Sequence, residues 1–254
     1  FINTRDEIMT DYNVEFAETF AVNTFDASKD TSLRLSSQMK MQQDIGEHQL
    51  TYFDLDYTAL RNRGYAFVVV STDAVIHRMP LLHETCKMVT WNRGAKGVKF
   101  YRCYNWYDAA GACVIEACSS FALVDFKTHK PVRSDVLSSE MASYFDRVNA
   151  AGTPKRILLP NTMTLSGQKH IFYSLIDYNG HLNNTCYADF ITDFMPGGMD
   201  GKRIVRYGVD YVREARENDN LRVYTAQQGN TVYFKGEHDR GECFRCYCVF
   251  EKDV

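Results

Sequence analysis

Along the chain, the pattern of apolar and polar positions runs through the same order of elements twice. The first half opens with a strand-like alternation, continues with a stretch rich in Gln, Met, Lys and Glu, which are good helix formers, and then shows four more strand-like runs. We predict that its elements are a strand at 13–23, a helix at 33–50, and strands at 65–78, 84–91, 98–108 and 113–126.

The second half repeats this order after a connector at 127–165, which contains three of the five prolines. Only a short helix, at 139–148, is expected inside the connector. The same kinds of pattern then return in the same sequence. The predicted elements are a strand at 169–177, a helix at 184–195, and strands at 202–213, 220–228, 231–237 and 242–251.

The second predicted helix carries one apolar stripe. Its members stand at positions i, i+3, i+4 and i+7, and they are Tyr187, Phe190, Ile191 and Phe194. Asn183 or Asn184 can cap the start of the helix, and the Pro-Gly-Gly run at 196–198 ends it. Such a stripe fits a helix that is wrapped by a sheet and buries most of its surface.

A helix that follows the first strand of an antiparallel sheet able to wrap around it is the arrangement of a hotdog domain. We therefore predict an α+β fold, a tandem (double) hotdog in which each half is a long helix wrapped by an antiparallel sheet. The expected divisions are an N-terminal hotdog at 1–135, a linker at 136–165 and a C-terminal hotdog at 166–254. A tandem already contains the pair that single hotdogs form by dimerising, so we expect a monomer or a homodimer.

Charge and hydropathy exclude two classes of partner. The formal net charge of −3 gives no overall basic character, so no nucleic acid is expected as a partner. The longest unbroken apolar run is near 66–70, far short of the roughly 20 residues of a membrane-spanning helix, so no membrane is expected either. The residues at 1–30 do not have the pattern of a signal peptide.

Eight cysteines are too few for a disulfide scaffold in a chain of 254 residues, and together with the missing signal they favour a cytoplasmic location. Three of them fall in 243-CFRCYC-248, whose CxxC spacing also occurs in zinc sites. No second CxxC or nearby His pair completes four ligands, so we expect buried thiols and no metal. No nucleotide-binding glycine motif is present, so no cofactor is expected.

The stretch 177-DYNGHLNN-184 is the strongest candidate for chemistry. In an extended backbone, Asp177, Asn179 and His181 would point the same way because side chains alternate with period two. Asp, Asn and Gly are also turn residues, and Asp177 and Asn179 could simply form Asx turns. The stretch is therefore either a hydrolytic site or a turn that leads into a helix cap.

With its continuation to 190, this stretch resembles the acyl-ACP thioesterases of plants and bacteria. In that family an Asp-x-Asn-x-His turn, two asparagines and a Tyr precede the second hotdog helix; here they are Asp177, Asn179, His181, Asn183, Asn184 and Tyr187. Two further segments, 76-IHRMPLLHETCKMVTW-91 and 121-FALVDFKTHKPVR-133, also look like family segments. The resemblance covers nearly the whole chain.

The resemblance also implies a catalytic glutamate on the strand after the second helix. The segment 211-YVREAR-216 places Glu214 at that position. Many plant members have a cysteine directly after this glutamate, but this chain has Ala215 there. A cysteine nucleophile at that position is thus not available, and activation of water becomes the better interpretation.

The family's site residues imply roles for the matching residues here. Glu214 would act as general base, with a pKa raised by partial burial, and His181 would share the proton or hold the water. Asn179 would donate a hydrogen bond to the thioester carbonyl, helped by free N–H groups at the helix start after Asn184. Asp177 would orient Asn179 or His181. Two structural alternatives to these roles stay open. Asp177, Asn179 and His181 could be turn residues without a catalytic role, and Glu214 could belong to a solvated, charged strand end.

The resemblance places the acyl chain in the first hotdog. Candidate lining residues, chosen by composition alone, are Met39, Met41, Ile45, Phe67, Val69 and Trp91. Asn183, Asn184 and Trp91 are candidates for substrate binding, although Trp91 also suits the core. His48, on the helix of the first half, weakly resembles the site of the second half, and it is interpreted as structural.

These expectations combine into a thioesterase that hydrolyses fatty acyl-ACP to free fatty acid and holo-ACP, with acyl carrier protein as partner. Because acyl carrier protein is acidic, its binder should carry a basic patch. The candidates are Lys202, Arg203, Arg206, Arg213 and Arg216. The alternatives are an acyl-CoA thioesterase, a non-catalytic hotdog that binds acyl groups, and a hotdog dehydratase.

Overall fold

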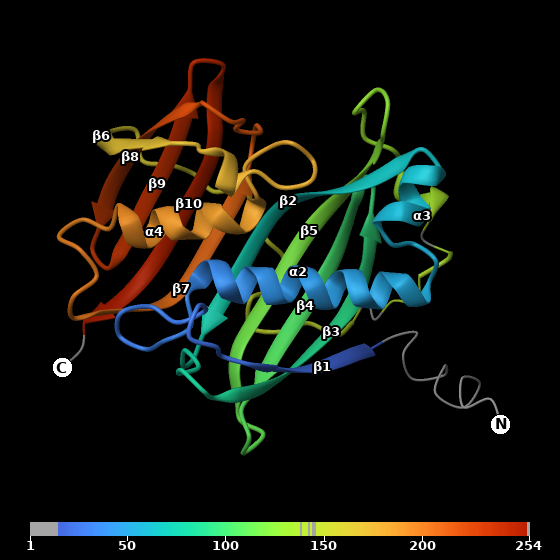
Figure 1. Cartoon of the computed structure of the whole chain (residues 1–254), viewed down its shortest axis with the longest axis horizontal. Coiled ribbons are helices and arrows are strands. Elements are labelled where there is room, and N and C mark those ends of the chain that lie inside the picture. The colour runs from blue at the N-terminus through green and yellow to red at the C-terminus, as the bar shows by residue number, and fades with distance from the viewer. Residues whose placement is uncertain (1–14, 138, 142, 144–145, 253–254) are drawn as a thin grey trace.

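The computed structural model describes residues 15–137, 139–141, 143 and 146–252. Within this part of the chain, one sheet of ten antiparallel strands runs through the whole molecule in the order β1-β3-β4-β5-β2-β7-β10-β9-β8-β6 (Figure 1). The first half contributes β1 (Glu15–Ala21), α2 (Leu35–Tyr52), α3 (Tyr57–Asn62), β2 (Tyr65–Ile76), β3 (Thr85–Lys96), β4 (Lys99–Tyr107) and β5 (Cys113–Asp125).

The second half has the same order of elements. It contributes β6 (Thr164–His170), the 3₁₀ turns η2 (Tyr173–Leu175) and η3 (Asn184–Ala188), α4 (Asp189–Asp193), β7 (Lys202–Tyr211), β8 (Asn220–Gln228), β9 (Thr231–His238) and β10 (Gly241–Lys252). From the edge inward, the halves read β1-β3-β4-β5-β2 and β6-β8-β9-β10-β7, which is the same arrangement. The predicted tandem hotdog is thus confirmed.

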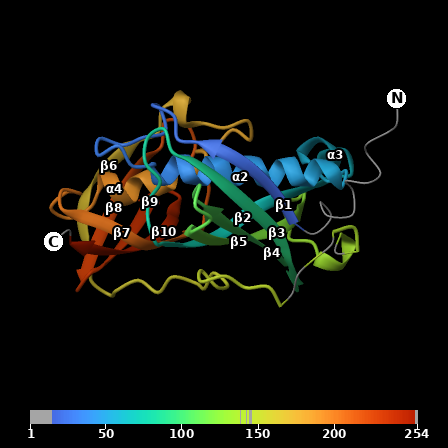
Figure 2. The same cartoon turned by 90° about the horizontal axis from the view of Figure 1, so that it is seen from below.

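The two halves meet where β2 pairs with β7, from Ser71 opposite Asp210 to Val75 opposite Arg206. The helices lie on one face of the joined sheet, and the connector between the halves runs along the other face (Figure 2). There the connector is held by bonds such as that from the Ile157 N–H to Asp210 Oδ2, at 2.7 Å. One face of the sheet is therefore left for the helices and for any space beneath them.

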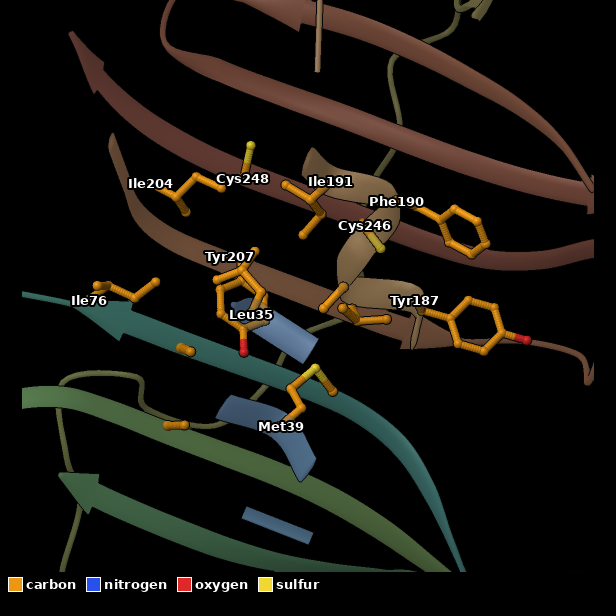
Figure 3. Packing of buried hydrophobic residues seen from close by; sticks show 14 of the residues in the cluster. Leu35, Met39, Ile76, Tyr187, Phe190, Ile191, Ile204, Tyr207, Cys246 and Cys248 are labelled. Atoms are coloured by element: carbon orange, nitrogen blue, oxygen red, sulfur yellow. The ribbon is translucent and has the colours of Figure 1, made fainter. Parts of the chain in front are cut away.

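A core beneath the helices includes residues from both halves. Leu35 and Met39 of α2 belong to one buried cluster with Tyr187 and the strand residue Tyr207, and Leu35 lies beside Tyr207 (Figure 3). Phe190 stacks on Phe244 of β10 with ring centroids 5.0 Å apart. Burying each such side chain contributes about 1.5–3 kcal/mol, so this shared core fixes the short second helix against the sheet.

The second helix is not the long one that was predicted. After Asn183 the chain forms the 3₁₀ turn η3, and α4 ends at Asp193. Asn183 Oδ1 accepts bonds from both the N–H and the hydroxyl of Thr185, a local pattern that competes with regular helix at its first turn. The left-handed conformations of Gly197 (φ 71°) and Gly198 (φ 75°) then turn the chain away.

Three other local predictions differ from the structure. The strand expected at 169–177 lies earlier, at β6, because pairing with β8 stops at His170 and the chain then leaves the sheet to form η2. The short helix α3, which Asp56 caps through the Ala59 N–H, was missed. The helix expected at 139–148 falls partly outside the described residues; those described there form turns and coil.

Cys246 and Cys248 stand two residues apart on β10, so both point from the same strand face into the core (Figure 3). Cys243 is buried in the same core because a bulge between Glu242 and Phe244 shifts the alternation. All eight cysteines are unpaired thiols. Among the described residues, no helix is both long and apolar enough to cross a membrane.

Candidate active site

A cavity of about 470 Å³ lies between α2, the sheet and the turn that follows η2. Its wall comes mainly from the first half, through α2 and strands β2 to β5. The second half contributes the proposed chemical groups, namely Asp177, Asn179, His181, Asn184 and Glu214. The fold thus brings all four catalytic candidates to one cavity, although Glu214 lies more than 30 positions away from the other three in sequence.

The residues at 177–181 form a closed turn and not the extended backbone from which their common direction was predicted. The Asp177 N–H donates to the His181 carbonyl at 2.9 Å, and the Gly180 N–H donates to the Asp177 carbonyl at 3.0 Å. Gly180 has φ 82°, a conformation that favours glycine. The three side chains line one cavity because of this turn, and the extended geometry that was predicted for them is wrong.

Asp177 supports its two neighbours in the turn. Its Oδ1 accepts the Asn179 N–H at 2.8 Å and lies 3.8 Å from His181 Nδ1. Its side chain is only 8% exposed, and that of His181 is 22% exposed. An Asx turn at Asp177 is therefore present, and the same buried carboxylate lies beside the His181 ring.

Glu214 follows the end of β7 and combines two features. Its side chain lines the cavity, and it also forms an ion pair with Arg216, whose Nε lies 2.9 Å from Oε1. Partial burial acts to raise the pKa of Glu214, but the hydrogen bond and charge of Arg216, aided by His181 and His129, outweigh it and lower the pKa. The predicted raised pKa is therefore wrong, because the expectation left out Arg216.

Backbone contacts tie the Glu214 segment to the turn. The Leu182 N–H donates to the Ala215 carbonyl at 2.8 Å, and His238 Nε2 lies 3.0 Å from the Glu214 carbonyl. Ala215 itself is fully buried. Ala215 stands where many plant members carry cysteine. Here its backbone carbonyl links the Glu214 segment to the turn at 177–181, and its side chain offers no nucleophile.

The two asparagines at the start of η3 have separate roles. Asn183 caps Thr185 and is not part of the cavity wall, whereas Asn184 lines the cavity. The N–H groups of Thr185 and Cys186 both bond to Asn183, through its side chain and its carbonyl. The expectation that N–H groups at this helix start would serve the substrate is therefore wrong for these two residues.

Trp91 lies on the face of the sheet opposite the cavity. Its Nε1 donates to the Arg147 carbonyl at 3.2 Å, and the Arg147 guanidinium sits 4.1 Å above its ring. The neighbouring Asn92 lines the cavity instead, since adjacent strand residues point to opposite faces. The structure thus gives Trp91 a packing position and no place for contact with substrate.

Of the other lining candidates, Met39, Phe67 and Val69 do line the cavity, whereas Met41 and Ile45 pack in the core. His48 lies outside the cavity wall, with Nδ1 2.8 Å from Glu18 Oε1. Sequence reasoning missed a group of cavity residues near α3 and the turn after β5. They are Tyr57, Arg61, Phe126, His129 and Tyr178.

A usable signal for part of this group was present in the sequence. The family-like segment 121–133 already contained His129, which now lies in the cavity wall. Tyr178 packs edge-on against Tyr57 of α3 with ring centroids 4.8 Å apart. The turn that carries the catalytic candidates therefore docks on the first half through a helix too short to be predicted from periodicity.

The proposed basic patch does not form one continuous surface. Arg206 pairs with Asp73, Arg203 with Glu251 and Arg216 with Glu214, so much of its charge is neutralised locally. In the described ranges, Arg61 and Arg213 form no ion pair with a carboxylate. Those ranges also hold no group of three or more His, Cys, Asp or Glu side chains placed to bind a metal.

Comparison with known families decides the identity of the chain. Residues 13–141 match the acyl-ACP thioesterase N-terminal domain, and residues 162–242 match the acyl-ACP thioesterase C-terminal domain. The chain belongs to the acyl-ACP thioesterase family. It is a thioester hydrolase.

Solved structures show the same fold at low sequence identity. An acyl-ACP thioesterase from Bacteroides thetaiotaomicron is 20% identical, with a TM-score of 0.86 over 93% of this chain and 98% of that one. The 12:0-ACP thioesterase from Umbellularia californica is 18% identical, with a TM-score of 0.80 over 94% and 98% of the two chains. No curated protein matches the sequence.

Proposed function

We propose that this family member hydrolyses fatty acyl-ACP to free fatty acid and holo-ACP and so ends chain elongation. The observation that carries the proposal is the placement of Asp177, Asn179, His181 and Glu214 in the wall of one cavity large enough for a small ligand. A pure acyl-binding protein has no need of a base and a hydrogen-bond donor together beside the carbonyl.

In the proposed reaction, Glu214 takes a proton from water, and His181 holds that water or shares the proton. The water oxygen bonds to the carbonyl carbon while the Asn179 side-chain amide donates to the carbonyl oxygen. The carbon–sulfur bond then breaks, the phosphopantetheine sulfur leaves with a proton, and the acid is released. Asp177 orients the turn through the Asn179 N–H and His181.

The lowered pKa of Glu214 has two consequences for this reaction. Arg216 keeps the carboxylate ionised at neutral pH, so the base is in its active form without prior loss of a proton. A lower pKa also makes the carboxylate a weaker base. His181 lies in the same cavity wall and would offset that weakness, since two groups would share the proton taken from water.

The two hotdogs would divide the work. We propose that the N-terminal hotdog, at 1–135, holds the acyl chain and that the C-terminal hotdog, at 166–254, supplies the chemistry, with a linker at 136–165. Wall residues such as Phe67 and Phe121 come from the first unit, and His181 and Glu214 come from the second. A substrate must therefore contact both units at once.

The test of the reaction is release of free thiol from acyl-ACPs of graded chain length, beside the matching acyl-CoAs. We expect turnover with acyl-ACP, and we expect Glu214→Gln to lower kcat by about 10²–10⁴-fold, the usual contribution of a general base. Gln keeps the size and the hydrogen-bonding shape while removing the basic oxygen. Full turnover in Glu214→Gln would exclude Glu214 as the base.

Acyl-CoA is the alternative carrier, and salt distinguishes the two. Arg61 in the cavity wall and the nearby Arg213 are cations without a carboxylate ion pair in the described part of the chain, which supports attraction of an acidic protein. We expect kcat/KM for acyl-ACP to fall steeply as salt rises, with a smaller effect for acyl-CoA. Equal salt dependence would favour the smaller carrier.

A further inference from the structure

The first-half wall of the cavity contains a row of buried polar side chains that an acyl tunnel does not need. Asn92 on β3 pairs with Arg102 on β4, Arg102 pairs with Ser119 on β5, and Ser119 pairs with Thr72 on β2. All four line the cavity and none is more than 5% exposed. The row crosses four neighbouring strands on the face that looks toward α2.

An apolar row runs beside this polar row. Phe100 on β4 pairs with Phe121 on β5, and Phe121 pairs with Val69 on β2. Each of these residues lies two or three positions along its strand from the polar residue of that strand. All three also line the cavity. The cavity therefore has an apolar part suited to methylene groups and a polar part suited to something else.

Helix α2 adds polar groups above the row. Gln42 and Gln49 lie on the same face of the helix, seven residues apart, and both are buried. Arg102 donates from Nη1 to Gln49 Oε1 and, at 3.3 Å, to Thr90 Oγ1. Both acceptors are neutral, so neither balances the charge of the guanidinium.

Arg102 has no ion pair within the described ranges, where no carboxylate oxygen lies within 4.0 Å of it. Glu47 attracts it only from a longer distance. Two further donors in the same wall, Gln42 Nε2 and Asn92 Nδ2, are buried and have no hydrogen-bond partner among the residues that the structure describes. Buried donors without acceptors are costly, so a cation and two amide donors in one wall indicate a bound group with acceptors.

We propose that the cavity binds acyl chains that carry an oxygen acceptor (a hydroxyl, oxo or carboxylate group) on their distal part. The idea rests on the proposed function, since it concerns the acyl group of that substrate. A carboxylate fits best because it is acceptor-only and carries the charge that Arg102 lacks as a partner. A plain hydrocarbon tail would cover these donors without satisfying them.

The position of the row sets the position of the oxygen. Thr72 pairs with Val209 of β7, at the junction with the catalytic half, and Asn92 stands three strands further into the first half. At a strand spacing of about 4.8 Å, Asn92 lies roughly 14 Å from that junction. With the thioester taken to lie at that junction, the acceptor would sit toward the far end of a medium-length chain.

The test compares acyl-ACPs of equal length with plain, ω-hydroxy and ω-carboxy tails in a thiol-release assay. We expect kcat/KM for at least one oxygenated tail to exceed that for the plain tail by about tenfold or more, as in sites built to hydrogen-bond a substrate oxygen. Asn92→Leu and Gln42→Met should reduce that preference. Neither change breaks a hydrogen bond of the described structure, so both variants should fold.

A matched control is Gln168→Met on the exposed edge strand β6, which should keep the wild-type preference for oxygenated tails.

A second readout measures binding and needs no turnover. Calorimetry measures binding of acyl-pantetheine amides, which cannot release thiol, with plain and oxygenated tails. If no acyl-ACP is hydrolysed, the proposed function fails, and the amide series still decides this inference.

Tighter binding of an oxygenated amide in the wild type, reduced in Asn92→Leu, would support the inference. Equal or tighter binding of the plain amide, unchanged in Asn92→Leu and Gln42→Met, would overturn it. That second result would mean that the donors are satisfied by trapped water and that the row has a structural role.

Discussion

At the scale of single residues, the site depends on which charged groups lie within reach of one another. The family resemblance singled out the Asp-x-Asn-x-His turn and Glu214, and the structure brings them to one cavity. The ion pair between Glu214 and Arg216 could not be predicted from the sequence, since it depends on how two side chains of one irregular segment turn. Trp91 was a wrong candidate because composition does not tell which face of a strand a side chain takes, and its neighbour Asn92 lines the cavity instead.

The pH dependence of activity tests the effect of Arg216 on Glu214. In the wild type the pKa of Glu214 is lowered, so the carboxylate stays ionised and active to lower pH. In Arg216→Met, burial would act with less opposition and the pKa would rise. We expect the acid limb of kcat/KM to move to higher pH, because that profile reports the free enzyme's essential base.

Arg213→Met is the matched control, because Arg213 donates to the Arg240 carbonyl and forms no bond with Glu214 in the structure. Its acid limb should stay close to that of the wild type. An unchanged limb in Arg216→Met, or a shift to lower pH, would show that Arg216 does not set the ionisation of the base.

At the scale of elements, most strands could be predicted because alternation and turn residues mark them; the prediction at 220–228 coincides with β8. The segment at 171–177 misled prediction because its apolar residues continue an alternation after the partner strand has ended. Phe172 and Tyr173 there are in fact mostly exposed. Of the two cap candidates, Asn183 is the cap, and the tight 3₁₀ turn that follows it was not predicted.

The cap at Asn183 makes a testable contribution to stability. Asn183→Ala removes the acceptor used by both the N–H and the hydroxyl of Thr185. We expect the free energy of unfolding to fall by about 1 kcal/mol, within the usual range of roughly 0.5–2 kcal/mol for a lost cap. Urea denaturation measures the change. Asn183→Asp keeps an acceptor and should stay near wild type; equal losses in both variants would argue against the cap.

At the scale of the whole molecule, the repeat of element order was enough to predict a tandem hotdog. It could not indicate that β2 and β7 join the halves into one sheet, nor that the core and cavity draw on both halves. Such contacts arise between segments far apart in sequence, where periodicity carries no information. The cytoplasmic location and the choice between monomer and homodimer stay predictions.

The shared core predicts that the halves unfold together. Phe190 of the second half packs in one cluster with Leu35 and Met39 of the first. We expect Phe190→Ala to lower the free energy of unfolding by about 3–5 kcal/mol and to move one common transition seen by tryptophan fluorescence and by circular dichroism. Both tryptophans, at 91 and 106, lie in the first half, so they report on the half that was not mutated.

Phe172→Ala is the control, since that ring is 62% exposed and should contribute about 0.5 kcal/mol or less. Separate transitions for fluorescence and circular dichroism, with only one of them moved by Phe190→Ala, would mean that the two hotdogs are independent folding units.

The central claim is that the turn at 177–181 is the centre of thioester hydrolysis, and one measurement tests it most directly. Thiol release from the preferred acyl-ACP is measured for wild type, His181→Ala and His48→Ala, the last being an exposed histidine outside the cavity wall. We predict that His181→Ala loses about 100-fold or more in kcat, while His48→Ala keeps the wild-type rate. Equal rates in all three proteins would contradict the account and leave the turn a structural cap.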